Sequence, residues 1–516
     1  MAQRFRVVDL FAGPGGLAEG FSSVLDEAGE RIFKIVLSVE KEASAHRTLT
    51  LRAFTRQFPP GQLPAAYYAF ANGEIELDDL QSKYFDEWSA AEEEALILEL
   101  GTDEGNAEID RRLDELLEEG PGDDIVVIGG PPCQAYSLVG RSRNVGKADY
   151  VAEEDNRHFL YREYIRILDK LSPAAFVMEN VKGILSSSVG GKRIFAQVRN
   201  DLEQAGRTGG GYRLIAMAPQ TKQDVGNDNH FADRDFIIRA EEHGVPQARH
   251  RVIIAGLRND LFEKAKIDLS TPLLRSRGTE RTTVRDVLYG LPALRSGLSR
   301  GDAPDAWRDA ALSAMEKVVA ATRGETRRVA VEAQSTVLGR NSVAPRECSD
   351  LSSVEVENDD LRRFLTDPRL SCLTGHAARG HMAADLARYF FCTVFREAQG
   401  RPPKAADFPQ AIAPDHQNWS SGKFADRFRV QGWDQPSTTV VSHIAKDGHY
   451  FIHPDPTQCR SLTVREAARL QTFPDNYIFR GNRTEQFVQV GNAVPPFLAR
   501  QIGEVLSELL STAEAR

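Results

Sequence analysis

The stretch that decides the fold is IVVIGGPPCQAYS, at residues 125–137. Its first four residues are apolar and β-branched, which predicts a buried strand. Two glycines let the backbone approach a ligand, and two prolines stiffen the chain that follows. Because open α/β sheets bind ligands where their strands end, we expect Cys133 at that edge of a sheet. It is either a nucleophilic thiolate or a small buried hydrophobic residue.

A second pattern of this kind stands near the N-terminus. Residues 6–11, RVVDLF, predict a first strand, and the glycine-rich turn AGPGGL at 12–17 leads into a helix. A second strand is predicted at 33–39, and it ends in Glu40. A turn of this type can hold a cofactor, and an acidic residue after the second strand can accept hydrogen bonds from ribose hydroxyls. Each feature alone is also consistent with a tight turn or a solvated carboxylate, but the combination favours a nucleoside-type cofactor.

Two later strands are expected to contribute to the same edge of the sheet. A helix at 157–171 precedes a strand at 175–178, which ends in Glu179. Further on, QARHR at 247–251 leads into a strand at 252–256. Arg249 and Arg251 have the same parity, so we expect both on one side at the start of that strand.

Composition limits the class of protein. A chain of 516 residues is long enough for two or three domains, and 41% hydrophobic with 27% charged residues fits a globular protein. We find no apolar run that could span a bilayer and no secretion signal, so we expect a cytoplasmic protein without membrane contact. The spacing of the five cysteines fits neither a zinc site nor a disulfide framework, so no metal is expected and a reducing compartment is favoured. These cysteines are residues 133, 348, 372, 392 and 459.

Charge is distributed unevenly along the chain. The net charge is −10, but residues 71–124 carry 20 acidic and 3 basic side chains, which leaves +7 for the remainder. Global acidity is therefore weak evidence against a nucleic-acid partner. Apolar spacing at 95–100 and 109–117 predicts that the acidic segment is a helical insertion with a solvated face. A partner-binding or DNA-mimicking surface is the less favoured alternative.

The alternation of strands and helices fades between residues 257 and 435, which are rich in arginine, proline and glycine. We interpret this region as a second domain, and its Tyr389-Phe390-Phe391 run as core rather than as a stacking platform. Regular patterning returns with two short strands predicted at 437–444 and 450–452. A helix follows at 462–471, where Thr463 and Glu466 form a capping box. An amphipathic helix reaching about Leu510 is expected after GNAVPP at 491–496.

Taken in order, these motifs resemble the cytosine-C5 DNA methyltransferase family over residues 5–256 and 436–510. The resemblance implies an α/β fold: a Rossmann-like, doubly wound methyltransferase domain with a second, smaller target-recognition domain. Residues 1–256 would form the catalytic domain that binds S-adenosylmethionine, with the acidic insertion at about 71–124. Residues 257–435 would form the target-recognition domain, and residues 436–516 would return to the catalytic domain. The acidic insertion obscures the third cofactor motif, and 220–236 looks like another insertion. The motifs are DLFAGPGGL (9–17), Glu40, GGPPCQAYS (129–137), ENVKG (179–183), QARHR (247–251), RSLTVREAARLQTFPD (460–475) and GNAVPP (491–496).

The resemblance also implies a role for each matching residue. Cys133 would add to C6 of cytosine, a protonated Glu179 would stabilise charge at N3, Arg251 would hold O2, and Arg249 would hold the loop or a phosphate. Candidate cofactor contacts are Phe11, Gly13, Gly15, Gly16, Leu17, Glu40, Pro132, Asn492 and Val494. Candidate DNA contacts are Gln134, Ser137, Arg141, Arg143, Thr439, His443 and Lys446, together with the arginine-rich second domain.

The function implied is methylation of cytosine C5 in duplex DNA by a bacterial enzyme of a restriction-modification or other defence system. The target base would be flipped out of the duplex to reach Cys133. We expect a monomer localised with the nucleoid and any restriction or defence partner to be a separate protein. Two alternatives remain. One is a tRNA cytosine methyltransferase, which the long 257–435 segment argues against; the other is a catalytically silent DNA-binding homologue, which the complete set of reactive residues argues against.

Overall fold

The computed structural model describes residues 4–132, 160–189, 192–206, 210–219, 231–269, 271–276, 278, 280–351, 358–415, 419 and 427–514. The chain forms two compact units. The first comprises Met1–Phe70, Ile75–Glu280 and Ala493–Arg516, and the second comprises Ala71–Glu74 and Arg281–Asn492. Within the described ranges, no helix is both long and apolar enough to cross a membrane.

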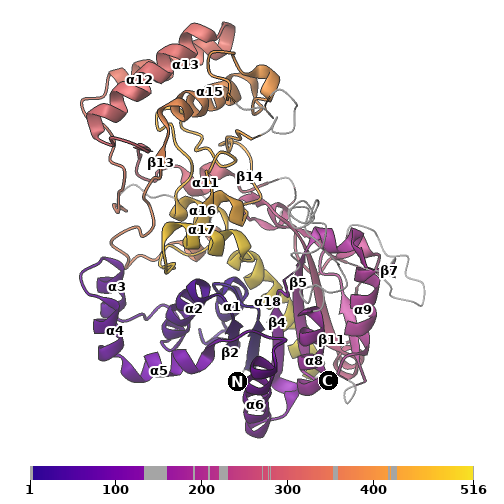
Figure 1. Ribbon diagram of the computed structural model, residues 1–516. Coiled ribbons are helices and arrows are strands. Elements are labelled where there is room, and N and C mark those ends of the chain that lie inside the picture. The colour runs from indigo at the N-terminus through magenta and orange to yellow at the C-terminus, as the bar shows by residue number, and fades with distance from the viewer. Residues whose placement is uncertain are drawn as a thin grey trace. The chain divides into compact units, whose positions relative to one another are not determined.

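A single large sheet organises the first unit (Figure 1). Its strands run in the order β3-β2-β1-β4-β5-β11-β8, and β9 pairs with β11. The first five strands in this order are parallel, whereas β11 is antiparallel to β5, β8 and β9. This topology confirms the doubly wound α/β prediction. The strands are β1 (Phe5–Leu10), β2 (Phe33–Glu40), β3 (Ala95–Ile97), β4 (Ile125–Gly129), β5 (Ala175–Val181), β8 (Tyr212–Ile215), β9 (Ile237–Arg239) and β11 (His250–Arg258).

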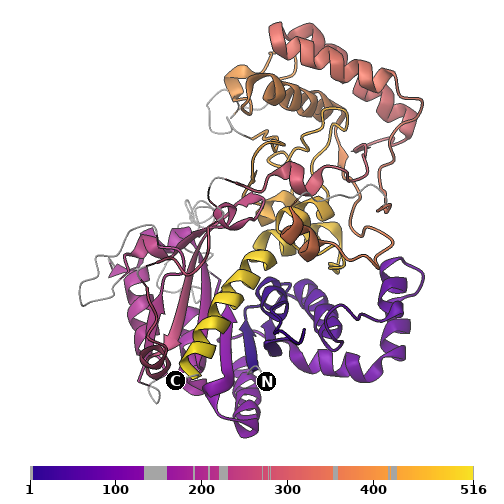
Figure 2. The same ribbon diagram turned by 180° about the vertical axis from the view of Figure 1, so that it is seen from behind.

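Helices cover both faces of this sheet. Figure 2 shows α18 lying along the face that α1 also covers. The helices are α1 (Gly16–Ser22), α2 (Ala43–Arg56), α3 (Ala65–Ala71), α4 (Leu77–Lys83), α5 (Phe85–Glu94), α6 (Asp103–Glu119), α8 (Leu160–Leu171), α9 (Ile194–Gln204), α10 (Asn259–Ala265) and α18 (Pro496–Glu514). Shorter elements are β6 (Ser188–Val189), β7 (Lys192–Arg193), β10 (Gln247–Ala248) and the 3-10 turns η1 (Gly122–Asp124), η4 (Lys182–Ser186), η6 (Asp233–Phe236) and η7 (Ala240–His243).

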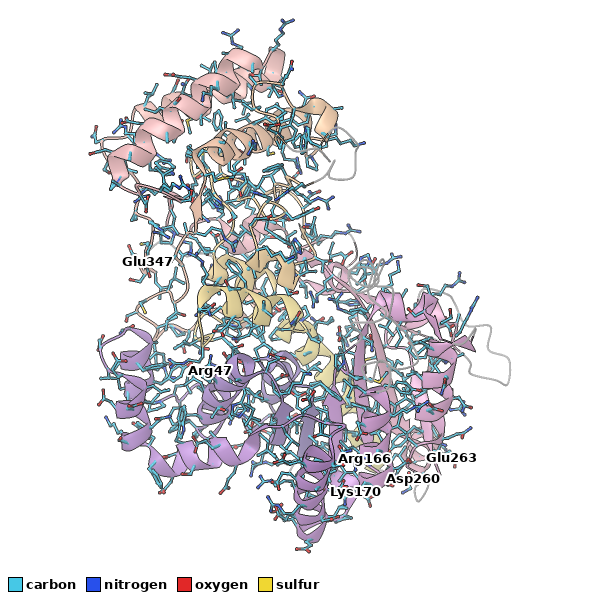
Figure 3. The ribbon with its side chains drawn as sticks, in the orientation of Figure 1. Arg47, Arg166, Lys170, Asp260, Glu263 and Glu347 are labelled. Carbon is cyan, nitrogen blue, oxygen red and sulfur yellow. The ribbon has the colours of Figure 1, made fainter. Side chains whose placement is uncertain are left out.

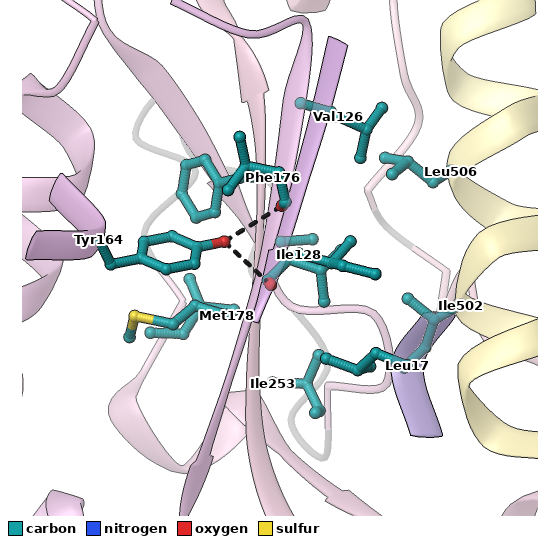
Figure 4. Close-up of a cluster of buried hydrophobic side chains, with 14 of the residues drawn as sticks. Leu17, Val126, Ile128, Tyr164, Phe176, Met178, Ile253, Ile502 and Leu506 are labelled. Atoms are coloured by element: carbon teal, nitrogen blue, oxygen red, sulfur yellow. Dashed lines mark hydrogen bonds between the residues drawn. The ribbon is translucent and has the colours of Figure 1, made fainter. Parts of the chain in front are cut away.

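The core of the first unit is built on the parallel strands (Figure 4). Ile502 and Leu506 of α18 lie on one side of the strands, and Tyr164 of α8 lies on the other. The Tyr164 hydroxyl lies 3.1 Å from the carbonyl oxygen of Val127 in β4 and 3.0 Å from that of Val177 in β5. Because a buried hydroxyl needs a partner, this arrangement ties α8 to the two strands that lead into the predicted active site.

The secondary structure of the acidic segment departs from the sequence prediction at residues 95–97. The run at 95–100, predicted to be helical, contains strand β3, which pairs with β2 so that Glu40 lies opposite Ile97. A short apolar run fits a strand and a helix equally well, and here pairing at the sheet edge decided the outcome. The remainder of the segment is mainly helical, as predicted.

The acidic face is also less uniformly solvated than predicted. Glu94 at the end of α5 is buried and ion-paired with Arg56 of α2. On α6, by contrast, Asp110 is partly exposed and pairs with Arg166 of α8, and Asp114 is exposed and pairs with Lys170. Arg166 and Lys170 are labelled in Figure 3. The insertion is therefore joined to the sheet domain by ion pairs, one of which lies in the interior.

The regular elements of the second unit are mainly helices. Its core lies mainly between α12, α13 and α15, and it contains the Tyr389-Phe390-Phe391 run, all three residues of which are buried as predicted. The helices are α11 (Val284–Leu288), α12 (Pro304–Ala321), α13 (Gly324–Leu338), α14 (Asp359–Leu365), α15 (Ala383–Gln399), α16 (Val464–Leu470) and α17 (Arg483–Asn492). The remaining elements are β12 (Gly297–Leu298), β13 (Gly380–His381), β14 (Ser437–Thr438), η8 (Ala405–Asp407) and η9 (Ser442–Ala445).

The strands predicted at 437–444 and 450–452 are largely wrong. Only Ser437–Thr438 is a strand, residues 442–445 form η9, and 450–452 contributes isolated bridges at Ile452. Close packing explains the turn: a Cβ on Gly491 of α17 would lie 2.3 Å from the Ser442 nitrogen, so the η9 backbone lies directly on that helix. The capping box of Thr463 and Glu466 at the start of α16 is confirmed.

Candidate active site

The glycine-rich turn after β1 adopts an unusual backbone. Gly13 and Gly15 have φ values of 59° and 97°, and Phe11 has a φ of 56° although it carries a side chain. Positive φ is uncommon for a residue other than glycine, and such strain gathers at functional sites. The turn is thus held in a special shape at the carboxyl end of β1.

Glu40 ties this turn to the end of β2. One carboxylate oxygen accepts a hydrogen bond from the Gly13 nitrogen at 2.8 Å, and the other accepts one from the Glu42 nitrogen at 2.7 Å. Burial raises the pKa of Glu40, and these backbone donors oppose that shift. Each carboxylate oxygen has two lone pairs, so Glu40 keeps the capacity to accept further hydrogen bonds.

The end of β4 fits tightly between its neighbours. A Cβ on Gly129 would lie 2.4 Å from the Leu10 carbonyl oxygen, and one on Gly130 would lie 3.1 Å from Glu179 Oε2. The Asn180 side chain also donates to the Pro131 carbonyl oxygen at 3.4 Å. A side chain at Gly129 would collide with the backbone of β1, and one at Gly130 would press on the Glu179 carboxylate. Glu179 therefore lies directly beside the chain that leads to Pro132.

Glu179 and two arginines form a charged cluster at this edge. Arg251 Nε lies 2.8 Å from Glu179 Oε1, and both side chains are largely buried. Burial lowers the pKa of Arg251, and Glu179 opposes that shift. Arg249 is completely enclosed, and its pKa is held well below the usual value, first by burial and then by Arg251. The structure therefore brings three of the four predicted catalytic residues together.

The fourth predicted catalytic residue, Cys133, lies outside the described residues. The same is true of four candidate DNA contacts, Gln134, Ser137, Arg141 and Arg143. Among the residues that are described, no group of His, Cys, Asp or Glu has the arrangement of a metal site.

Val494 lies close to the glycine turn within the first unit. A Cβ on Gly16 would lie 2.4 Å from the Val494 carbonyl oxygen, so the chain before α18 packs directly on the start of α1. Leu17 is buried in the same core. Asn492 is the last residue of α17 in the second unit, where it is exposed.

The described DNA candidates surround η9 in the second unit. His443 lies within η9, with its ring 6.2 Å from that of Tyr450, and Lys446 follows the turn and is exposed. Thr439 is partly exposed just after β14. Residues 439–446 thus form a compact turn that presents polar and basic side chains.

Sequence reasoning assigned no role to Asp9. This residue is fully buried in β1, and neither carboxylate oxygen has a hydrogen-bond partner among the described residues. Burial raises the pKa of Asp9 well above its usual value. The sequence signal that could have drawn attention to Asp9 is the presence of an acidic residue inside an otherwise apolar strand.

Sequence reasoning also left the third strand end unplaced. The Leu98 nitrogen donates to the Glu40 carbonyl oxygen at 3.0 Å, directly after β3. The segment that starts at Leu98 therefore lies beside Glu40, which places the strand end that the sequence alone left open.

A mostly parallel sheet in this order, with a strained glycine turn after β1 and an acidic residue after β2, defines the class of Rossmann-like methyltransferases. The family model described as C-5 cytosine-specific DNA methylase matches residues 115–294 and 378–508. The chain belongs to this family, whose enzyme class is DNA (cytosine-5-)-methyltransferase.

Similarity to known proteins extends over nearly the whole chain. The type II methyltransferase M.Bpa9945I of Bacillus paralicheniformis is 33% identical, over 98% of this chain and 99% of its own length. M.AgeI, a type II methyltransferase of Thalassovita gelatinovora, is 28% identical over 78% of this chain and 87% of its own. The DNA (cytosine-5-)-methyltransferase M.ApeKI of Aeropyrum pernix is 28% identical over 75% of this chain and 81% of its own.

Proposed function

We propose that this enzyme transfers a methyl group from S-adenosylmethionine to C5 of a cytosine flipped out of a specific duplex sequence. One observation carries this proposal: Glu179, ion-paired with Arg251, lies against Gly130, three residues before Cys133. A carboxyl and a guanidinium beside a cysteine are the groups that nucleophilic attack on cytosine requires.

The ends of β1 and β2 suit S-adenosylmethionine. A Cβ on Gly13 would meet no atom within 4 Å, so the turn leaves open space there, and Glu40 can accept hydrogen bonds from ribose hydroxyls. Phe11, Gly15, Gly16, Leu17, Pro132 and Val494 would complete the contacts within the first unit, and Asn492 is kept as a candidate on the basis of its sequence motif. When bound, this cofactor supplies an electrophilic methyl group on a sulfonium.

The chain's own residues prepare the base. The Cys133 thiolate would add to C6, which makes C5 nucleophilic. Arg251 would donate a hydrogen bond to O2, and the O–H of a protonated Glu179 carboxyl would donate one to N3. In the structure Glu179 is paired with Arg251, so the entering base would exchange part of this ion pair for its own contacts. Once C5 is methylated, loss of its proton and departure of the Cys133 sulfur restore the pyrimidine ring. Arg249 would position the loop or a phosphate.

Residues 257–435 are the candidate for target recognition, and residues 281–435 of this range belong to the second unit. We assign Thr439, His443 and Lys446 as DNA contacts, in addition to Gln134, Ser137, Arg141 and Arg143. Reading a duplex sequence needs polar side chains that can enter a groove, and the turn at 439–446 presents several. Any cognate nuclease would be a separate protein.

Bisulfite sequencing of plasmid DNA from cells that express the protein tests this proposal. We expect conversion-resistant cytosines within one sequence context for the wild type and none for Cys133→Ala. The matched control is Cys348→Ala, which removes a partly exposed cysteine of the second unit and should leave the pattern unchanged. Methyl transfer to tRNA but not to duplex DNA would instead support the RNA alternative.

A trapping experiment tests the covalent step. Duplex DNA with 5-fluorocytosine at the target should form a stable adduct with the wild type, because fluorine cannot leave as a proton does. Cys133→Ala should bind the same DNA without forming an adduct. Binding by the wild type with no adduct would refute thiolate addition.

A further inference from the structure

Arg379 is a buried cation with little compensation from the protein. Its residue is 7% exposed, and its guanidinium donates one hydrogen bond, from Nη2 to the Ile444 carbonyl oxygen at 2.8 Å. Its Nε has no hydrogen-bond partner in the described part of the chain, and no carboxylate of that part pairs with it. A guanidinium has five N–H donors, so most of its capacity is unused. Burying an uncompensated charge is costly, and such groups concentrate at functional sites.

A second arginine, Arg483, lies on the face of α17 whose Phe487 ring contacts Arg379. The Arg379 guanidinium lies 4.7 Å from the centre of the Phe487 ring. Arg483 precedes Phe487 by four residues on α17, so the two share one face of that helix. Arg483 is exposed, and no described side chain forms an ion pair with it. Burial, and next the charge of Arg483, lower the pKa of Arg379 to about 10, as expected for neighbouring cations.

The nearby acids are already engaged. The charge of Asp447 raises the pKa of Arg379, but the Asp447 carboxylate lies 3.1 Å from Arg427 and 4.0 Å from His449. Arg346, whose charge affects Arg483, lies 3.3 Å from Asp302. The Arg379–Arg483 pair therefore retains positive charge that the described protein does not neutralise.

This pair is joined to the turn at 439–446. Ile444, whose carbonyl oxygen accepts from Arg379, belongs to η9, and the exposed Lys446 lies two residues further on. A Cβ on Gly448 would lie 3.7 Å from Arg379 Cζ, so the chain after the turn packs on this guanidinium as well. Arg379 thus links η9 to α17 and leaves donors available beside the turn.

We propose that Arg379 and Arg483 bind the phosphate backbone of duplex DNA and so fix the turn at 439–446 against the substrate. This inference rests on the proposed function, because it takes DNA as the substrate. Planar guanidinium groups suit phosphate oxygens, which accept two parallel hydrogen bonds. Phosphate contacts position a protein on DNA without reading its sequence, so the pair would add affinity rather than sequence preference.

Salt-dependent DNA binding by the full chain tests this inference. The probe is a labelled duplex of mixed sequence, and its association constant is measured between about 50 and 200 mM salt. Arg483→Gln should reduce the slope of log K against log salt by about 0.9, which corresponds to about eightfold weaker binding at 0.1 M salt. Arg379→Gln should reduce the slope similarly, provided that thermal melting shows it folded; because Arg483 is exposed, its variant decides the question in either case.

The matched control is Arg111→Gln on α6 of the first unit, which removes an exposed arginine that pairs with Glu108 at 2.6 Å. Its slope should equal that of the wild type. A slope for Arg483→Gln indistinguishable from this control would overturn the inference, as would a loss of binding confined to the target sequence. Methyl transfer by the wild type is measured in parallel: if it fails, the proposed function fails, whereas an unchanged slope with active wild type refutes only the phosphate site.

Discussion

Gly130 is the position at which a single methyl group tests the geometry of the site. Its φ is not in the left-handed region, so the backbone accepts alanine. The new Cβ, however, would lie 3.1 Å from Glu179 Oε2, which is closer than ordinary van der Waals contact. Because Glu179 Oε1 lies 2.8 Å from Arg251 Nε on its other side, the carboxylate cannot withdraw without disturbing that pair.

The magnitude follows from this distance. The carboxylate must move by a few tenths of an ångström, whereas a misplacement of about 1 Å can cost about 100-fold in rate. We therefore expect Gly130→Ala to lower kcat about tenfold, equivalent to about 1.4 kcal/mol of activation free energy. Stability should change by less than about 1 kcal/mol, because the backbone conformation suits alanine.

Steady-state methyl transfer to plasmid DNA measures this effect, with cofactor affinity and thermal melting measured on the same preparation. The control is Gly339→Ala in the second unit, where the nearest atom to a new Cβ is the Ser335 carbonyl oxygen at 3.4 Å. It should behave as the wild type. A Gly130→Ala enzyme with unchanged kcat would refute the placement of Glu179 beside the chain that leads to Cys133. So would an enzyme whose loss of activity is explained by unfolding.

Three other outcomes are expected. Glu40→Ala should weaken S-adenosylmethionine about tenfold or more in calorimetric titration but leave DNA affinity unchanged, and equal loss of both would show that Glu40 is only structural. Gly20→Ala should destabilise the first unit by about 1–3 kcal/mol in denaturant titration, because its Cβ would lie 2.5 Å from the Pro496 carbonyl oxygen; unchanged stability would contradict the close approach of α1 and α18. Burial lowers the pKa of His453 to about 4. An unfolded histidine binds a proton below about pH 6.5, but the buried one does so only near pH 4, so the second unit should lose stability as pH falls through that window. A calorimetric melting temperature that does not change between pH 7 and pH 4 would argue against a role of His453 in this loss of stability.

The sequence was sufficient to predict the position of a strand wherever an apolar run led directly to a distinctive polar residue. The strands that end near Leu10, Glu40 and Gly129 were predicted in place, as were the start of β5 and the association of Glu179 with Arg251 at one edge of the sheet. Strand ends in a parallel sheet meet at one edge, so order along the chain translates directly into position.

Prediction failed where tertiary contacts chose between local alternatives. Residues 95–97 became a strand because β2 offered an unpaired edge, and residues 442–445 became a turn because Gly491 allowed close approach. The burial of Arg379 could not be predicted either, because it depends on Phe487 and Ile444, which lie far along the chain. Such long-range contacts leave no periodic signal.

The packing of α18 on α1 joins residues 496–514 to residues 16–22. A nascent chain on the ribosome therefore keeps one side of its sheet uncovered until residue 496 has emerged, and must be kept from aggregating during that time. The same delay means that α18 must be synthesised before the new enzyme can begin to methylate DNA.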